Sequence, residues 1–150
     1  MRVYLVIMDE TEEAVRALRF ASRRATKTGG AVHILALVPR ESFNAFGAVQ
    51  ATIEEEARDR AEMVASSAAG SLFAESGKMP VISVRTGDAQ GVIKDYLAEH
   101  PEVAALVLGA ASEGGPGPLV THFSSHIGAL TCPLFIVPGT LTDEDIDRLS

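Results

Sequence analysis

Five short, almost continuous apolar runs alternate along the chain with stretches in which apolar residues recur every three or four positions. The runs are rich in β-branched residues, show no polar alternation, and cover residues 3–8, 31–38, 81–84, 104–108 and 134–137. Runs of this kind are typical of parallel strands that are buried on both faces. We therefore predict five parallel strands separated by helices.

The first two helices are indicated by their spacing and by the residues at their ends. The first opens at Thr11, has acidic residues in its first turn, and closes at the pair Gly29–Gly30. Hydroxyl and carboxylate groups stabilise a helix N-terminus, and glycine readily adopts the conformation that ends a helix. The second helix carries an apolar stripe that begins at Ile53 and ends at Leu72, flanked by charged residues.

Three further helices follow from the same signals. One is expected over residues 89–99 with Asp88 as its N-cap, and a shorter one over residues 118–130. Thr142 begins a capping box that opens a terminal helix. Residues 39–49 are left as the long loop that precedes the second helix.

Strands and helices in this order predict an α/β fold of the doubly wound type. Right-handed crossovers would place helices on both faces of a five-stranded parallel sheet, which makes a three-layer α/β/α sandwich. The 150 residues fit one domain, and no linker or repeat divides residues 1–150.

Composition limits which binding partners and which cellular compartment are expected for the protein. A net charge of −7 argues against nucleic acid, because phosphate binding needs a basic face. The single cysteine, Cys132, excludes an internal disulfide framework and a cysteine-based zinc site. No run is long enough to span a membrane, and the first apolar run does not resemble a signal peptide. The expected compartment is the cytoplasm.

Ligands of such sheets bind beyond the carboxyl ends of the strands, so motifs were sought there. No glycine fingerprint of a dehydrogenase and no P-loop occurs, and both classes are excluded. The acidic pair Asp9–Glu10 suggests a receiver domain, which also needs an aspartate that closes the third strand and a lysine that closes the fifth. Those strands end instead at residues 85–88 and 138–139, which contain neither group in that place.

A glycine-rich loop follows the fourth strand and precedes a helix. Its glycines would expose backbone N–H groups near a helix N-terminus, which is how proteins hold anions, and hydroxyls of the helix would add donors. The glycines are Gly109, Gly114, Gly115 and Gly117, and the hydroxyls are Thr121, Ser124 and Ser125. An ordinary exposed turn has the same composition, so both interpretations stand.

Four segments in order resemble the universal stress protein family. Residues 8–13 are similar to its D-G-S-E-x-S, residues 85–89 to x-x-G-D-P, residues 106–110 to V-M-G-S, and residues 132–138 to C-P-V-L-V-V. The resemblance covers essentially the whole chain.

This resemblance implies a sheet ordered 3-2-1-4-5 and a homodimer made through the last strand, by Leu134, Phe135, Ile136 and Val137. For the ATP-binding branch it implies that Asp9 holds the ribose of ATP or another adenine nucleotide, with or without Mg²⁺. Backbone groups near Leu37 would contact the adenine.

The resemblance further implies phosphates in a G-x2-G-x9-G-S/T loop. Gly109 matches its first glycine, whereas Ser112 stands at the second. The final pair falls on His122–Phe123 or on Val120–Thr121, depending on the end from which it is counted. The other glycines of this loop are at positions 114, 115 and 117 instead.

Other chemistry-bearing residues have simpler interpretations. Asp9 could equally cap the first helix. His122 and His126 have the spacing of metal ligands but lack a third ligand, which favours a solvated or phosphate-adjacent pair. Cys132 and His33 are interpreted as buried structural residues. No nucleophile–base pair can be argued from spacing, so no catalytic residue is expected, and ATP hydrolysis would be slow at most.

The sequence therefore supports two hypotheses about function. The first is a homodimeric stress-response protein that binds an adenine nucleotide. The second is a dimer of the same fold that has lost the nucleotide and acts through interaction partners.

Overall fold

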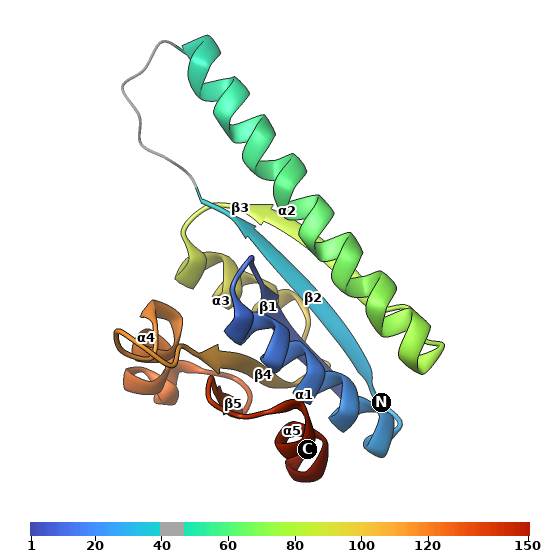
Figure 1. Cartoon of the computed structure of the whole chain (residues 1–150). Coiled ribbons are helices and arrows are strands. Elements are labelled where there is room, and N and C mark those ends of the chain that lie inside the picture. Colours follow the sequence, from blue (N-terminus) through green and yellow to red (C-terminus); the bar gives the residue numbers. More distant parts are fainter. Residues whose placement is uncertain (40–46) are drawn as a thin grey trace.

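The computed structural model describes residues 1–39 and 47–150, and Figure 1 shows a sheet between two layers of helices. All strand pairings are parallel, in the order β3-β2-β1-β4-β5, which confirms the predicted architecture. The strands are β1 (Val3–Met8), β2 (Ala31–Val38), β3 (Val81–Thr86), β4 (Val103–Ala110) and β5 (Leu134–Pro138).

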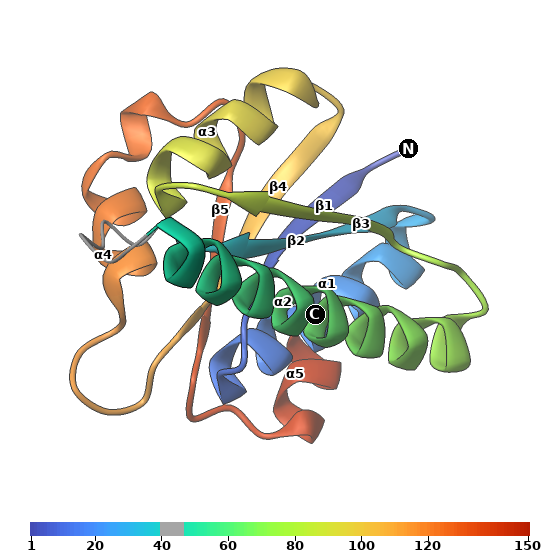
Figure 2. The same cartoon turned by 90° about the horizontal axis from the view of Figure 1, so that it is seen from above.

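The helices divide between the two faces of the sheet, as Figure 2 shows from above. Helices α1, α2 and α5 pack on one face, and α3 and α4 pack on the other. Their bounds are α1 (Glu12–Thr28), α2 (Gly47–Ser76), α3 (Ala89–Glu99), α4 (Pro118–Ser125) and α5 (Asp143–Leu149), with a 3₁₀ turn at Ile127–Ala129. No helix of the described part is long and apolar enough to cross a membrane.

The predicted helix ends are confirmed by their hydrogen bonds. The Thr11 side chain accepts from Ala14 N, and the Asp88 side chain accepts from Gly91 N. Thr142 and Asp145 form the reciprocal bonds of a capping box. These local bonds satisfy N–H groups that would otherwise lack partners, which explains why the ends were readable from sequence.

Two helix boundaries differ from the prediction. Helix α2 begins at Gly47, so the end of the expected 39–49 loop is helical; residues 40–46 lie outside the described part. The helix expected over residues 118–130 ends at Ser125, and the chain tightens into a 3₁₀ turn around Gly128. Glycine weakens a helix interior, and 3₁₀ turns are common at helix C-termini.

The prediction that every strand is buried on both faces was wrong for the two edge strands, β3 and β5. Val81 is 49% exposed and Ile82 is 38% exposed on β3, and Ile136 is 40% exposed on β5. In contrast, all six residues of β1 are buried. Within the described chain, β3 and β5 each pair with one neighbouring strand. Their sequences resemble those of the central strands, but a larger part of their side chains is exposed.

Helix α5 is held against α1 by charged groups. Arg19 donates from Nε and Nη2 to the two carboxylate oxygens of Asp147, at 2.9 and 2.8 Å, and Arg23 lies 3.1 Å from the same carboxylate. The hydrogen bond from Arg19 is the main cause that lowers the pKa of Asp147. A bidentate pair of this kind fixes orientation, so α5 has one defined position on α1.

A buried hydrogen bond joins α3 to the sheet. His33, on β2, is 8% exposed, and its Nδ1 lies 2.7 Å from the hydroxyl of Tyr96, on α3. Burial is the main cause that lowers the pKa of His33 and raises that of Tyr96. His33 is therefore a structural residue, as predicted.

Candidate functional site

A hollow of about 350 Å³ lies at the carboxyl ends of β1 and β2, where the fold places ligands. Asp9 and Leu37, both singled out from the sequence, line it together. The remaining wall residues are Met8, Glu10, Pro39, Ala57, Arg60, Ala61 and Val64. The volume is within the range of small-ligand sites, and apolar side chains predominate in the wall.

Asp9 has an acceptor oxygen available at this hollow. Its side chain is exposed, and its Oδ1 accepts from Thr11 N at 2.8 Å and from the Thr11 hydroxyl. Oδ2 has no hydrogen bond with the described residues. The N-cap of α1 is Thr11, so the alternative that Asp9 caps this helix was wrong. The turn fixes the carboxylate in place and leaves one oxygen for a donor such as a sugar hydroxyl.

Helix α2 contributes a wall that was not predicted from the sequence. Arg60 Nε lies 3.8 Å from Glu10 Oε1, and both residues border the hollow beside Asp9. In the sequence, Arg60 is one of the charged residues that flank the apolar stripe of this helix. Arg60 directly precedes Ala61, a member of that stripe, and this position was the signal for a residue at the sheet edge.

Gly109, the first glycine of the resemblance, is required by packing. A Cβ at this position would overlap the backbone carbonyl of Glu13, in the first turn of α1. Gly139 has a similar role, because its Cβ would overlap the carbonyl of Ala110 at the end of β4. The end of β4 therefore abuts the start of α1, and Gly109 lies close to the segment that carries Asp9.

The rest of the predicted anion loop does not line the Asp9 hollow. Gly114, Gly115 and Gly117 all have positive φ, from 70° to 103°, in a loop that Figure 2 shows extending outward between β4 and α4. Ala111 N donates to Pro116 O at 3.0 Å, which closes the loop on itself.

The hydroxyls predicted to assist the loop lie on the outer side of α4. Thr121 and Ser124 are exposed, and the Ser124 hydroxyl donates to the Thr121 carbonyl at 3.4 Å. Neither residue is among those lining the hollow that holds Asp9 and Leu37. The structure thus brings together the expected nucleoside-binding residues and leaves the expected phosphate-binding residues apart from them.

An apolar hollow with a fixed carboxylate suits an adenine and a ribose, since a carboxylate accepts hydrogen bonds from sugar hydroxyls. Asp9 and Glu10 would repel phosphates there, and Arg60 is the cation among the described lining residues. The residues fit the nucleoside part of the ligand; the anion site would have to come from the glycine loop.

The histidine pair on α4 stacks face to face. The rings of His122 and His126 lie 4.5 Å apart at 23°, and His126 Nδ1 lies 2.8 Å from the His122 carbonyl. Desolvation is the main cause that lowers the pKa of His122, with the His126 charge adding to it. Within residues 1–39 and 47–150, no group of three His, Cys, Asp or Glu residues is placed to hold a metal ion.

Cys132 is half-buried and precedes β5 rather than opening it. Burial is the main cause that raises the pKa of its thiol, which disfavours the reactive thiolate. It packs beside the α3–α4 face of the sheet, consistent with a structural role.

Solved structures of the same fold are found in distant organisms. The universal stress protein UspA from Lactobacillus plantarum has a TM-score of 0.80 and 18% identity, covering 91% of this chain and 97% of that one. A universal stress protein from Archaeoglobus fulgidus in complex with dAMP gives 0.61 and 18%, covering 91% and 97%. One from Arabidopsis thaliana with AMP bound gives 0.61 and 16%, covering 96% and 95%.

Sequence comparison gives the family directly. No curated protein matches the chain by sequence. The model of the universal stress protein family matches residues 1–138, which include all five strands and end before α5. The chain belongs to the universal stress protein family.

Proposed function

We propose that this protein binds an adenine nucleotide at the hollow that holds Asp9 and Leu37. The observation that carries the proposal is the pairing of a fixed, exposed carboxylate on β1 with an apolar wall from β2 and α2. Structures of related folds have been solved with AMP, dAMP and cAMP. The Asp9 carboxylate would accept hydrogen bonds from the ribose, and ATP, with or without Mg²⁺, is the first ligand to test.

The nucleotide is tested first on the purified protein. Denaturation should release an adenine nucleotide into the supernatant, or ATP with Mg²⁺ should raise the midpoint of thermal unfolding, because ligand that binds only the folded state stabilises it. If the supernatant holds no nucleotide and AMP, ATP and ATP–Mg²⁺ all leave the midpoint unchanged, the proposal is rejected.

Replacing Asp9 by alanine should weaken nucleotide binding roughly tenfold, since hydrogen bonds to a charged group contribute about 1.5–3 kcal/mol. Isothermal titration measures the dissociation constant. Glu12→Ala is the matched control, because it removes an exposed carboxylate from the first turn of α1 that does not line the hollow. Equal dissociation constants for Asp9→Ala and the parent protein would show that Asp9 does not contribute to nucleotide binding.

One observation favours the second hypothesis, a dimer that works through partners without nucleotide. The glycine loop lies outside the Asp9 hollow, and its Gly114 and Gly115 are exposed. The release experiment above separates the two functions. In either case we propose no catalytic role beyond slow hydrolysis.

We also propose that the protein is a homodimer joined through β5. Its outer edge has no partner strand within the described chain, and Ile136 is 40% exposed there. An uncovered apolar edge strand is a site for pairing with another chain. Leu134, Phe135, Ile136 and Val137 would form this interface.

A charged side chain at this edge should produce monomers. Ile136→Lys is expected to shift the mass measured by light scattering from dimer to monomer, because a lysine cannot be buried unpaired at low cost. Ile82→Lys is the matched control: the same residue, 38% exposed, on the opposite edge strand. Monomers from Ile82→Lys and dimers from Ile136→Lys would place the interface on β3.

A further inference from the structure

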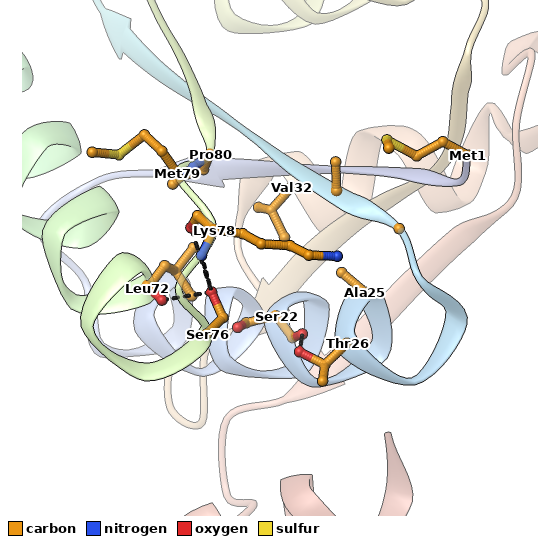
Figure 3. Close-up of a pocket in the computed structure, with 12 residues that line it drawn as sticks. Met1, Ser22, Ala25, Thr26, Val32, Leu72, Ser76, Lys78, Met79 and Pro80 are labelled. Atoms are coloured by element: carbon orange, nitrogen blue, oxygen red, sulfur yellow. Dashed lines mark hydrogen bonds between the residues drawn. The ribbon is translucent and has the colours of Figure 1, made fainter.

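A second hollow, of about 320 Å³, opens at the amino ends of the strands, far along the sheet from Asp9. Figure 3 shows it between the C-terminal ends of α1 and α2, beside the start of β2 at Val32. Ala25, Val32 and Leu72 form an apolar wall, and Pro80 adds to it. Cavities of about 150 Å³ with such walls bind benzene, so this one has room for a hydrocarbon chain of roughly eight carbons.

A lysine without a partner extends across this hollow. Figure 3 shows the Lys78 side chain extending from the α2–β3 connection toward Ala25. Its ammonium makes no ion pair or hydrogen bond with the described residues. Lys27, on the nearby end of α1, differs, because its Nζ donates to the Ser150 carbonyl at 2.8 Å.

The backbone beneath this lysine is held in place. The Ser76 hydroxyl donates to the Leu72 carbonyl at 2.7 Å and accepts from Lys78 N at 3.2 Å. The hollow also contains Ser22, which is 8% exposed on α1 and whose hydroxyl makes no hydrogen bond with the described residues. A cation and a few hydroxyl groups, from Ser22, Thr26 and Ser76, therefore accompany a mainly apolar wall, which is the composition expected for a small-ligand site.

From this combination we infer that the hollow binds an aliphatic monocarboxylate, with its chain against Ala25, Val32 and Leu72 and its carboxylate at the Lys78 ammonium. Lys78 is the side-chain cation among the described lining residues, and one carboxylate matches its charge. A more highly charged ligand would be left uncompensated in a protein whose net charge is −7. The exposed side chain of Met79 at the rim is unbranched and adaptable, which suits chains of different length.

Octanoate is the probe and 1-octanol the uncharged comparison of similar length. Titration of the parent protein with octanoate, below its micelle concentration, should give saturable binding with a dissociation constant on the order of 1 mM or below. Methyl resonances of Val32 and Leu72 should shift with the same dissociation constant. Absence of saturable binding would overturn the inference.

Two substitutions separate the charge from the cavity. Lys78→Met keeps an unbranched stem and removes the charge of an exposed lysine, so it should weaken octanoate binding roughly two- to fivefold and leave octanol unchanged. Ala25→Met places a longer apolar side chain into the hollow and should abolish binding of both. Circular dichroism checks that each variant is folded.

Lys94→Met is the control for general loss of charge, since Lys94 is an exposed lysine on α3, on the other face of the sheet. It should bind octanoate like the parent. If Lys78→Met and Ala25→Met both bound octanoate with the affinity of the parent protein, the ligand would bind elsewhere and the site would be rejected. ATP titrations of the same variants keep the two proposals distinct, because the nucleotide hollow shares no residue with this one.

Discussion

Gly109→Ala should lower the free energy of unfolding by roughly 3 kcal/mol, although it adds a single methyl group. The added Cβ would overlap the Glu13 carbonyl, a backbone atom that cannot rotate away. Either the first turn of α1 or the end of β4 must move, and both carry buried neighbours. Urea unfolding monitored by circular dichroism measures the change.

Gly70→Ala is the control for this substitution. Gly70 lies inside α2, and an added Cβ there meets nothing within 4 Å. Alanine should therefore stabilise this helix by roughly 0.5–1 kcal/mol, because glycine loses more conformational freedom on folding. If both variants were as stable as the parent, the close approach of β4 and α1 would not be a constraint of the fold.

The stability of Gly109→Ala decides how Gly109, near the end of β4, is interpreted. The resemblance assigned Gly109 to a phosphate loop, whereas the packing requires glycine there with or without a ligand. A loss of nucleotide binding in Gly109→Ala would follow from misfolding alone. Asp9→Ala is for this reason the variant that tests the site.

Phe123→Ala should lower the free energy of unfolding by roughly 3–5 kcal/mol and should release α4 from the sheet. Phe123 is 1% exposed and lies in the core between β4 and α3. Helix α4 has only eight residues and no side-chain hydrogen bond at its Gly117 N-cap, so packing must hold it. Urea unfolding measures the stability, and hydrogen exchange of α4 amides measures the local release.

The control is Ile127→Ala, two residues after the end of α4. Ile127 is 50% exposed, so its truncation should change stability by well under half as much. If Phe123→Ala lost no more stability than Ile127→Ala, the anchor of α4 would lie elsewhere. Faster exchange confined to α4 in Phe123→Ala would show that the loop and its hydroxyls, Thr121 and Ser124, depend on this one side chain for their position.

Much of the fold could be predicted because its signals are local. β1 and β2 have the predicted bounds, and so does α3, because a continuous apolar run and the cap at Asp88 act within a few residues. The misjudged helix boundaries are the start of α2 at Gly47, which borders residues outside the described part, and the end of α4 at Ser125, where the chain passes into a 3₁₀ turn. The order of the strands came with the family resemblance and agrees with the structure.

The candidate site could be predicted only in part. Asp9 was found because it follows a strand, and Leu37 was implied by the family resemblance; the two lie together because the carboxyl ends of neighbouring parallel strands meet at one edge. The contribution of Arg60 was missed, because it depends on where a helix from another part of the chain crosses that edge. The outward course of the loop at Gly114 was likewise not readable from its glycines.

The sequence by itself determined the strands, the helices and their caps, because periodicity and hydrogen bonds between near neighbours act over short distances along the chain. Only the tertiary structure decided how far the edge strands are covered, why Gly109 must be glycine, and where Lys78 extends across an apolar wall. Those features arise from contacts between segments that are far apart in sequence. Their geometry is set when the layers pack, as between Gly109 and Glu13.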